Sequence, residues 1–180
     1  MNQNNYMQFI VTYVGAKYES KQDIKADTLI LEAQRYFNQK GKSQYTPLAN
    51  YYAAQLHYES GNFPKALESY LYAVNSHDTP DNGLLISKSL NNIGYIYYRQ
   101  DLLDSAIIYF QEALSYYDNM KTIDQRKLKI LTNIGRSFEE SNILNSATIY
   151  YNKVLDQSLE IDNENYQSYS LQNWGNTIKP

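Results

Sequence analysis

A chain of 180 residues has room for one ordinary domain or one short repeat array with a core that needs no cross-links. The absence of cysteine excludes disulfides, thiolate nucleophiles and cysteine-ligated metals, and a net charge of −3 argues against a nucleic-acid-binding protein, which usually carries a basic excess. The most apolar stretch, residues 9–16, is far shorter than the roughly 20 residues that span a bilayer, so no membrane insertion is expected.

The start of the chain, MNQNNYMQ, lacks the charged segment and the small-residue cleavage site of a secretory signal. The chain is therefore expected in the cytoplasm, or in the periplasm if a leader has been removed.

Helical spacing of apolar and small residues runs through the whole chain and predicts helices joined by short polar turns. Pro64 suits the first turn of a helix, and Asp104 and Asn145 are expected to cap the helices that follow them. In chain order, the expected helices contain residues 10–14, 26–33, 50–57, 66–73, 90–97, 106–113, 131–138, 147–154 and 171–175.

Two motifs alternate along these helices. The first is Leu-x-Asn, a large apolar residue and Gly, and it occurs as LNNIG, LTNIG and LQNWG. A mid-helix glycine costs roughly 1 kcal/mol relative to alanine, so its recurrence indicates that these helices approach a partner helix closely. The glycines of the three copies are Gly94, Gly135 and Gly175.

The second motif places a small, an aromatic and a small or branched residue on one helical face, as in Ala106, Phe110 and Ala113. It is repeated from Ala66 and from Ala147, and a degenerate version is expected from Ala26. The four alanines that begin these copies are 40, 40 and 41 positions apart. Nearly constant spacing of two alternating helix motifs predicts stacked helix pairs.

These residues resemble the tetratricopeptide repeat, most closely at Leu90, Ile93, Gly94, Tyr97 and the 106–113 motif. The resemblance implies an all-α, right-handed α-solenoid of antiparallel helix pairs over residues 1–180, with about four and a half repeats. The period of about 40 is longer than the family's 34 residues. The expected repeats are 7–46, 47–86, 87–127 and 128–167, followed by a partial repeat, 168–180.

No constellation typical of catalysis, a metal or a cofactor is apparent. His57 occupies a position that the repeat uses for packing, and His77 lies in a polar turn; neither has a histidine or cysteine partner at ligand spacing. The glycines are scattered rather than gathered in a phosphate-binding loop. The chain is therefore expected not to be an enzyme and to need no cofactor.

The resemblance also implies that certain positions of each first helix face a concave groove. Tyrosine, amide and cationic side chains dominate these positions, which suits an extended peptide held by stacking, hydrogen bonds and carboxylate pairing. The alternative, that the tyrosines only pack between helices, stays open. The expected groove residues are Tyr51, Gln55, Tyr58, Lys88, Asn91, Tyr95, Tyr98, Lys129, Thr132 and Arg136.

The function expected from this resemblance is a non-catalytic scaffold that binds a protein or peptide. Joint substitution of Lys88, Tyr95 and Arg136 is expected to abolish partner capture without loss of helicity. The alternative is the sensor segment of a larger bacterial regulator, because similar repeats precede the output domains of such proteins; it would bind a peptide or small ligand. The last expected helix, with Leu171 and Trp174, either packs on the preceding repeat as a cap or pairs with a second copy in a homodimer.

Overall fold

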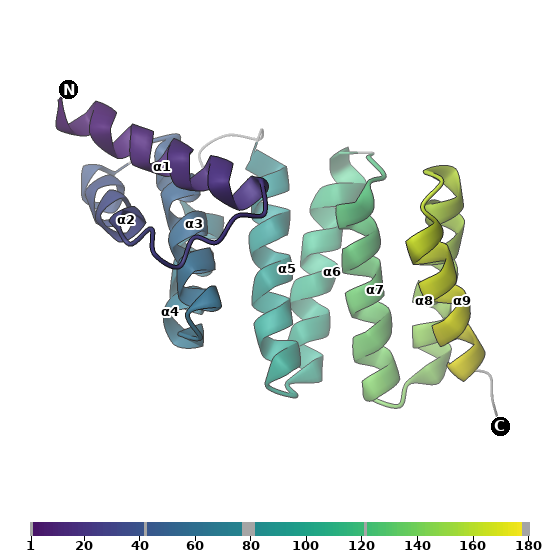
Figure 1. Cartoon of the computed structure of the whole chain (residues 1–180). Coiled ribbons are helices and arrows are strands. Elements are labelled where there is room, and N and C mark those ends of the chain that lie inside the picture. Colours follow the sequence, from purple (N-terminus) through teal and green to yellow (C-terminus); the bar gives the residue numbers. More distant parts are fainter. Residues whose placement is uncertain (1, 42, 77–81, 121, 178–180) are drawn as a thin grey trace. The chain divides into compact units, whose positions relative to one another are not determined.

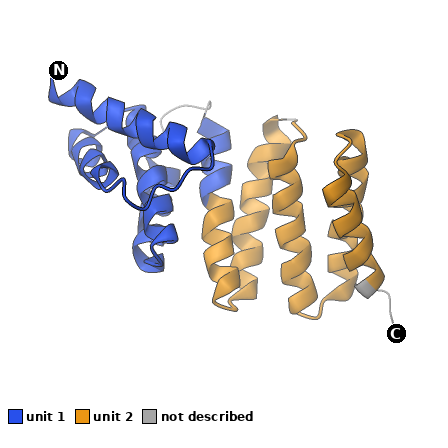
Figure 2. Ribbon diagram, in the orientation of Figure 1, with its two compact units in different colours: residues 1–89 blue, residues 90–180 orange. Residues whose placement is uncertain are grey.

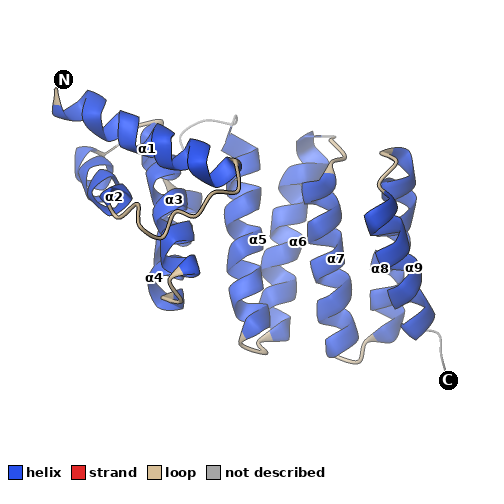
Figure 3. Cartoon of the chain, in the orientation of Figure 1, coloured by secondary structure: helices blue, strands red, loops and turns tan. Residues whose placement is uncertain are grey.

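The computed structural model describes residues 2–41, 43–76, 82–120 and 122–177, with side-chain surroundings as far as residue 175. Every regular element in these ranges is a helix (Figures 1 and 3), which confirms the predicted all-α fold. The helices are α1 Gln3–Glu19, α2 Leu29–Lys40, α3 Tyr45–Glu59, α4 Phe63–Asn75, α5 Gly83–Arg99, α6 Leu103–Met120, α7 Gln125–Glu140, α8 Leu144–Glu160 and α9 Glu164–Thr177. None of the described helices combines the length and apolar character needed to cross a membrane.

The helices form two compact units, Met1–Ser89 and Leu90–Pro180, called unit 1 and unit 2 below (Figure 2). The boundary falls within α5. In unit 1, α1 packs on α2 and α3, and α3 packs on α2 and α4; in unit 2, α7 packs on α6 and α8, and α9 packs on α8. Within each unit, these helices pack on their neighbours in sequence, as stacked helix pairs do. The single solenoid over 1–180 and its repeat boundaries stay a prediction.

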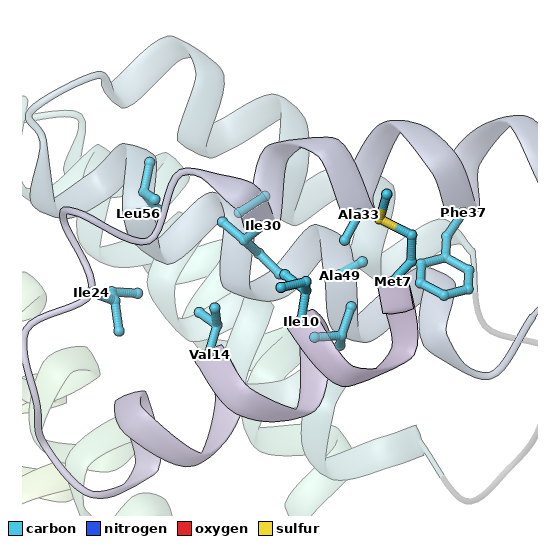
Figure 4. Close-up of a cluster of buried hydrophobic side chains, with 11 residues drawn as sticks. Met7, Ile10, Val14, Ile24, Ile30, Ala33, Phe37, Ala49 and Leu56 are labelled. Carbon is cyan, nitrogen blue, oxygen red and sulfur yellow. The ribbon is translucent and has the colours of Figure 1, made fainter. Parts of the chain in front are cut away.

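The core of unit 1 is formed by α1, α2, α3 and one residue of the α1–α2 connection, Ile24 (Figure 4). Ile24 is fully buried, and the neighbouring Asp27 forms a 2.6 Å ion pair with Lys17 on α1. The connection is therefore held at two points, one apolar and one charged. The remaining buried residues of this core are Met7, Ile10, Val11, Val14, Ile30, Ala33, Phe37, Ala49, Ala53 and Leu56.

The expected start of the second helix of the first pair is wrong. Ala26 is exposed in a turn, and α2 begins at Leu29. The small and aromatic residues that this helix buries are Ala33 and Phe37, both fully buried. Because Ile24 lies in the core, residues 25–28 turn before α2 starts. The packing motif therefore begins at Ala33, seven positions later than expected. Ala33 lies 33 positions before Ala66, which is near the ordinary period of the family.

The same tight turn ends four of the first helices. After α3, Gly61 adopts a φ of 76°, its N–H donates to the carbonyl of Tyr58, and the N–H of Asn62 donates to that of His57. These two hydrogen bonds satisfy carbonyls that would otherwise lack a donor at the end of the helix. They require the left-handed conformation at Gly61. Residues with φ of 59–60° and the same two bonds follow α1, α5 and α7 at Lys21, Asp101 and Asn142.

The predicted helix starts are confirmed in part. Pro64 lies in the first turn of α4, behind the cap Asn62, whose side chain accepts the N–H of Lys65. Asn145, by contrast, lies inside α8, and the capping position is Ile143, which has no side-chain oxygen to accept a bond. Asp104 also lies inside its helix, in the first turn of α6, where the helix dipole stabilises a carboxylate.

The close packing predicted at the motif glycines is confirmed at two of three positions. A Cβ placed on Gly94 would lie 2.7 Å from the ring of Phe110 on α6, and one on Gly135 would lie 2.8 Å from the ring of Tyr151 on α8. Only glycine allows these rings to lie against the helix backbone. At Gly175 the prediction is wrong, because a Cβ there would meet nothing within 4 Å among the described residues.

Candidate functional site

Two of the three α3 residues expected in the groove, Tyr51 and Gln55, are buried in unit 1. Tyr51 is 3% exposed, with its ring 6.0 Å from that of Tyr18 and 5.3 Å from that of Tyr52. Burial raises the pKa of Tyr51 well above its ordinary value, so its hydroxyl stays protonated at neutral pH. Gln55 is 4% exposed, and its Nε2 has no hydrogen-bond acceptor among the described residues. This burial leaves little of either side chain for a partner to contact.

The other two expected residues of unit 1 are accessible in part. Tyr58 is half-buried on α3 and its ring lies 5.6 Å from that of Phe63. Lys88 at the start of α5 forms a 2.7 Å ion pair with Glu19, and its Nζ lies 5.9 Å from the centre of the Tyr51 ring. The charge of Lys88 is thus already balanced within unit 1.

Unit 2 brings together four polar and aromatic residues, which we call the tyrosine–arginine cluster: Tyr95, Tyr98, Arg136 and Glu140. Tyr98 on α5 is stacked on Tyr95, with ring centres 6.0 Å apart and planes 17° from parallel. Arg136 on α7 donates from Nη2 to the Tyr98 hydroxyl at 2.7 Å, and its guanidinium lies 4.9 Å from the centre of the same ring. The Tyr98 hydroxyl in turn donates to Oε1 of Glu140.

The protonation state of this cluster is set by its surroundings. Burial raises the pKa of Tyr98, and the hydrogen bond to Glu140 raises it further, so the phenol remains a neutral donor. Burial alone would lower the pKa of Arg136, but Tyr98, Tyr169 and Glu140 outweigh that effect and raise it. At neutral pH the cluster therefore presents a fixed, charged guanidinium beside two parallel phenol rings.

The remaining predicted residues of unit 2 divide between buried and exposed. Asn91 is 6% exposed and accepts a 3.0 Å hydrogen bond from Nδ2 of Asn133. Thr132 is 8% exposed, and its Oγ1 has no hydrogen-bond partner among the described residues. Lys129 is exposed on α7. Its position is seven residues before Arg136, which places both cations on one side of the helix.

Unit 1 also contains a cavity of about 580 Å³ that the sequence analysis did not predict. It lies between the end of α1, the α1–α2 connection and the end of α3. Burial raises the pKa of its Glu59, and the nearby Asp23 raises it further. The mixed charges of the segment YESKQDIK, residues 18–25, were the available sequence signal. The cavity is lined by Tyr18, Glu19, Lys21, Gln22, Asp23, Lys25 and Glu59.

His57 belongs neither to the tyrosine–arginine cluster nor to the lining of the cavity. His57 is half-buried on α3, and burial followed by the charge of Lys65 lowers its pKa. His77 lies outside the described residues. Within the described ranges, no group of three or more histidine, cysteine or acidic side chains could hold a metal ion.

The solved structures that are similar to this chain include the following two. The N-terminal domain of stress-induced protein-1 (STI-1) from C. elegans aligns with a TM-score of 0.61 at 16% identity, over 74% of this chain and 94% of that one. BtubC (BKLC) from P. vanneervenii aligns with a TM-score of 0.69 at 17% identity, over 95% of this chain and 76% of that one. No protein-family model and no curated protein sequence matches the chain. The fold is a tetratricopeptide-like α-solenoid of helix pairs.

Proposed function

We propose that the chain is a non-catalytic scaffold that binds a protein or peptide, and that the tyrosine–arginine cluster recognises an acidic group on this partner. The observation that supports the proposal is the state of Arg136. Its guanidinium donates a hydrogen bond to Tyr98. No carboxylate of the described residues lies within 4.0 Å of the guanidinium, so it forms no salt bridge with them. A half-buried cation without an ion pair is suited to form one with a carboxylate of a partner.

The arrangement also reduces the cost of binding. Arginine normally loses side-chain entropy when it is ordered, but Arg136 is already ordered by its contacts with Tyr98. The planar guanidinium presents its N–H donors in a geometry that fits a carboxylate. The stacked rings of Tyr95 and Tyr98 offer an apolar surface beside it. The exposed Lys129 adds a second positive charge on the same helix. A peptide with an acidic residue or a terminal carboxylate next to an apolar side chain fits this chemistry.

The proposal predicts that Arg136→Ala weakens peptide binding by roughly 10- to 100-fold, because a charge-assisted hydrogen bond contributes about 1.5–3 kcal/mol. A library of random dodecapeptides displayed on phage would be selected on the unmodified chain. Affinities of the selected synthetic peptides would then be measured by titration calorimetry.

The matched control is Arg126→Ala on the same helix. Arg126 is an exposed arginine that already pairs with Asp124 at 2.9 Å, so its loss is expected to change the affinity less than twofold. Equal affinities for the unmodified chain and the Arg136 variant would contradict the assignment. So would selected peptides that carry no acidic group.

The cavity of unit 1 supports a second candidate, a sensor segment that binds a small ligand or short peptide. Its volume of about 580 Å³ falls within the range of small-molecule sites. Its lining differs from that of most such sites because it is rich in charges of both signs. A zwitterion such as a free amino acid or dipeptide matches this lining, with its amino group at Glu59 and Asp23 and its carboxylate at Lys21 or Lys25.

This candidate predicts a rise in the melting temperature when amino acids and dipeptides are screened, by a few degrees at ligand concentrations well above the dissociation constant. Glu59→Gln is expected to remove the rise, whereas the exposed Glu68→Gln on α4 is expected to retain it. A complete screen without a shift would count against the sensor. It would leave the peptide-binding proposal untouched, since that surface lies in unit 2.

A further inference from the structure

Two glutamates follow Arg136 on α7 at the spacings where helices commonly pair charges. Glu139 and Glu140 come three and four residues after Arg136, and side chains at these spacings are neighbours on a helix surface. An arginine and a glutamate so placed can form an ion pair. Neither carboxylate does so here, because neither lies within 4.0 Å of the guanidinium. The reason lies in what the two carboxylates bind instead.

Each of the two carboxylates accepts a hydrogen bond from a tyrosine of a neighbouring helix. The hydroxyl of Tyr98 on α5 donates to Oε1 of Glu140. The hydroxyl of Tyr151 on α8 donates to Oε2 of Glu139 at 2.5 Å. Burial raises the pKa of both tyrosines, and the hydrogen bond to the glutamate raises it further in each case. Both phenols therefore remain protonated donors at neutral pH.

The rings of both tyrosines are fixed by packing. Tyr151 is fully buried, and its ring lies so close to Gly135 that a Cβ there would be 2.8 Å from it. The ring of Tyr98 is stacked on Tyr95, and its centre lies 4.9 Å from the guanidinium of Arg136. A fixed ring fixes its hydroxyl, so the carboxylate that accepts from this hydroxyl is held in one place.

We propose that Tyr98 and Tyr151 are positioning residues that hold the two glutamates of α7 away from Arg136 and so keep its guanidinium available to the acidic group of a partner. This role rests on the proposed function of the tyrosine–arginine cluster and names what keeps its cation unpaired. A glutamate that loses its tyrosine donor turns to the next donor within reach, which is the guanidinium three or four residues earlier. A partner's carboxylate would then have to displace that glutamate.

The two tyrosines differ in a way that isolates this role. The Tyr98 hydroxyl also accepts a 2.7 Å hydrogen bond from Nη2 of Arg136, so it orders the arginine as well as holding Glu140. The Tyr151 hydroxyl bonds Glu139 and makes no hydrogen bond to Arg136. An effect of Tyr151 on binding therefore has to pass through Glu139.

The experiment removes one hydroxyl at a time and leaves each ring in place. Tyr98→Phe and Tyr151→Phe are each expected to weaken peptide binding about three- to tenfold, because affinity falls with the fraction of molecules in which Arg136 is unpaired. The probe is the tightest-binding acidic dodecapeptide from the phage selection, measured by titration calorimetry. Tyr109→Phe on α6 is the matched control. Tyr109 is a half-buried tyrosine stacked on Tyr97, and its loss of a hydroxyl is expected to change the affinity less than about twofold.

Rescue by glutamine separates positioning from packing. Glu140→Gln is expected to recover most of the affinity that Tyr98→Phe loses, and Glu139→Gln most of the affinity that Tyr151→Phe loses, because a neutral amide does not compete for the guanidinium. Each glutamine is expected to rescue its own tyrosine variant and not the other. A defect in packing would not be repaired by either substitution. Recovery with neither glutamine, or equal recovery with both, would overturn the proposal.

Crystal structures of the two phenylalanine variants supply a measurement that needs no peptide. The guanidinium of Arg136 is expected within 4.0 Å of the Glu140 carboxylate in Tyr98→Phe and of the Glu139 carboxylate in Tyr151→Phe. A guanidinium that stays unpaired in both variants would overturn the positioning role, whatever the binding data. The expected pairs in an otherwise unchanged chain that binds no acidic peptide would contradict the proposed function and support the positioning of the glutamates.

Discussion

Replacement of Phe110 by alanine is expected to lower the free energy of unfolding by about 3–5 kcal/mol, the range for truncation of a buried aromatic residue. Phe110 is fully buried, and its ring fills the space that Gly94 leaves on α5. Loss of the ring would remove its own burial and leave a cavity between α5 and α6. Neighbouring helices cannot close that cavity without moving their own packed side chains.

The measurement is urea unfolding followed by circular dichroism at 222 nm. Phe9→Ala is the matched control, because Phe9 is 54% exposed on α1. It is expected to cost about 1 kcal/mol or less, mainly through its stacking on Tyr13. Similar midpoints for the two variants would show that the ring of Phe110 does not anchor the α5–α6 pair.

Alanine in place of glycine is expected to have opposite effects at two copies of the same motif. At Gly175, where nothing lies within 4 Å among the described residues, Gly175→Ala is expected to raise stability by roughly 0.5–1 kcal/mol, because alanine favours the helix. At Gly94 the new Cβ would lie 2.7 Å from the ring of Phe110. Overpacking of this kind costs about 1–3 kcal/mol, which exceeds the gain in helix propensity.

Gly15→Ala supplies an intermediate case. The nearest atoms there belong to the outer end of Tyr52, which is half-buried and able to rotate away. We expect the order of unfolding midpoints in urea to be Gly175→Ala highest, then Gly15→Ala, then Gly94→Ala. Stabilisation by Gly94→Ala would mean that the glycine is not required for the close approach of α5 and α6.

The sequence predicted the helices well because helical periodicity is a local property. Each expected helix after the first pair lies within an observed one, and the glycine–aromatic contacts of α5–α6 and α7–α8 follow from the motifs. The second helix of the first pair was misplaced because two sets of residues fit the same pattern. Ala26 begins one and Ala33 the other, and the choice depended on Ile24, whose burial requires α1 and α3 to be in place.

The candidate site was predictable as a set of residue types but not as a set of contacts. Tyr98, Arg136 and Tyr95 were expected from the family resemblance, and the structure places them together. The bond from Tyr98 to Glu140 joins residues 42 positions apart and has no signature in either segment. The cavity around Glu59 was missed for a similar reason, because it joins the end of α3 to the α1–α2 connection, which is distant from it in sequence.

The sequence by itself determined the order of the helices, the type of fold and the glycines at which helices can pack closely. The tertiary structure alone decided which of those glycines are covered and which tyrosines are buried. Tyr51 and Tyr98 are both tyrosines of first helices that were expected in the groove, yet the first is 3% exposed and the second is half-buried. The physical reason is that spacing along a helix depends on neighbours in sequence, whereas burial depends on side chains that other helices bring from a distance.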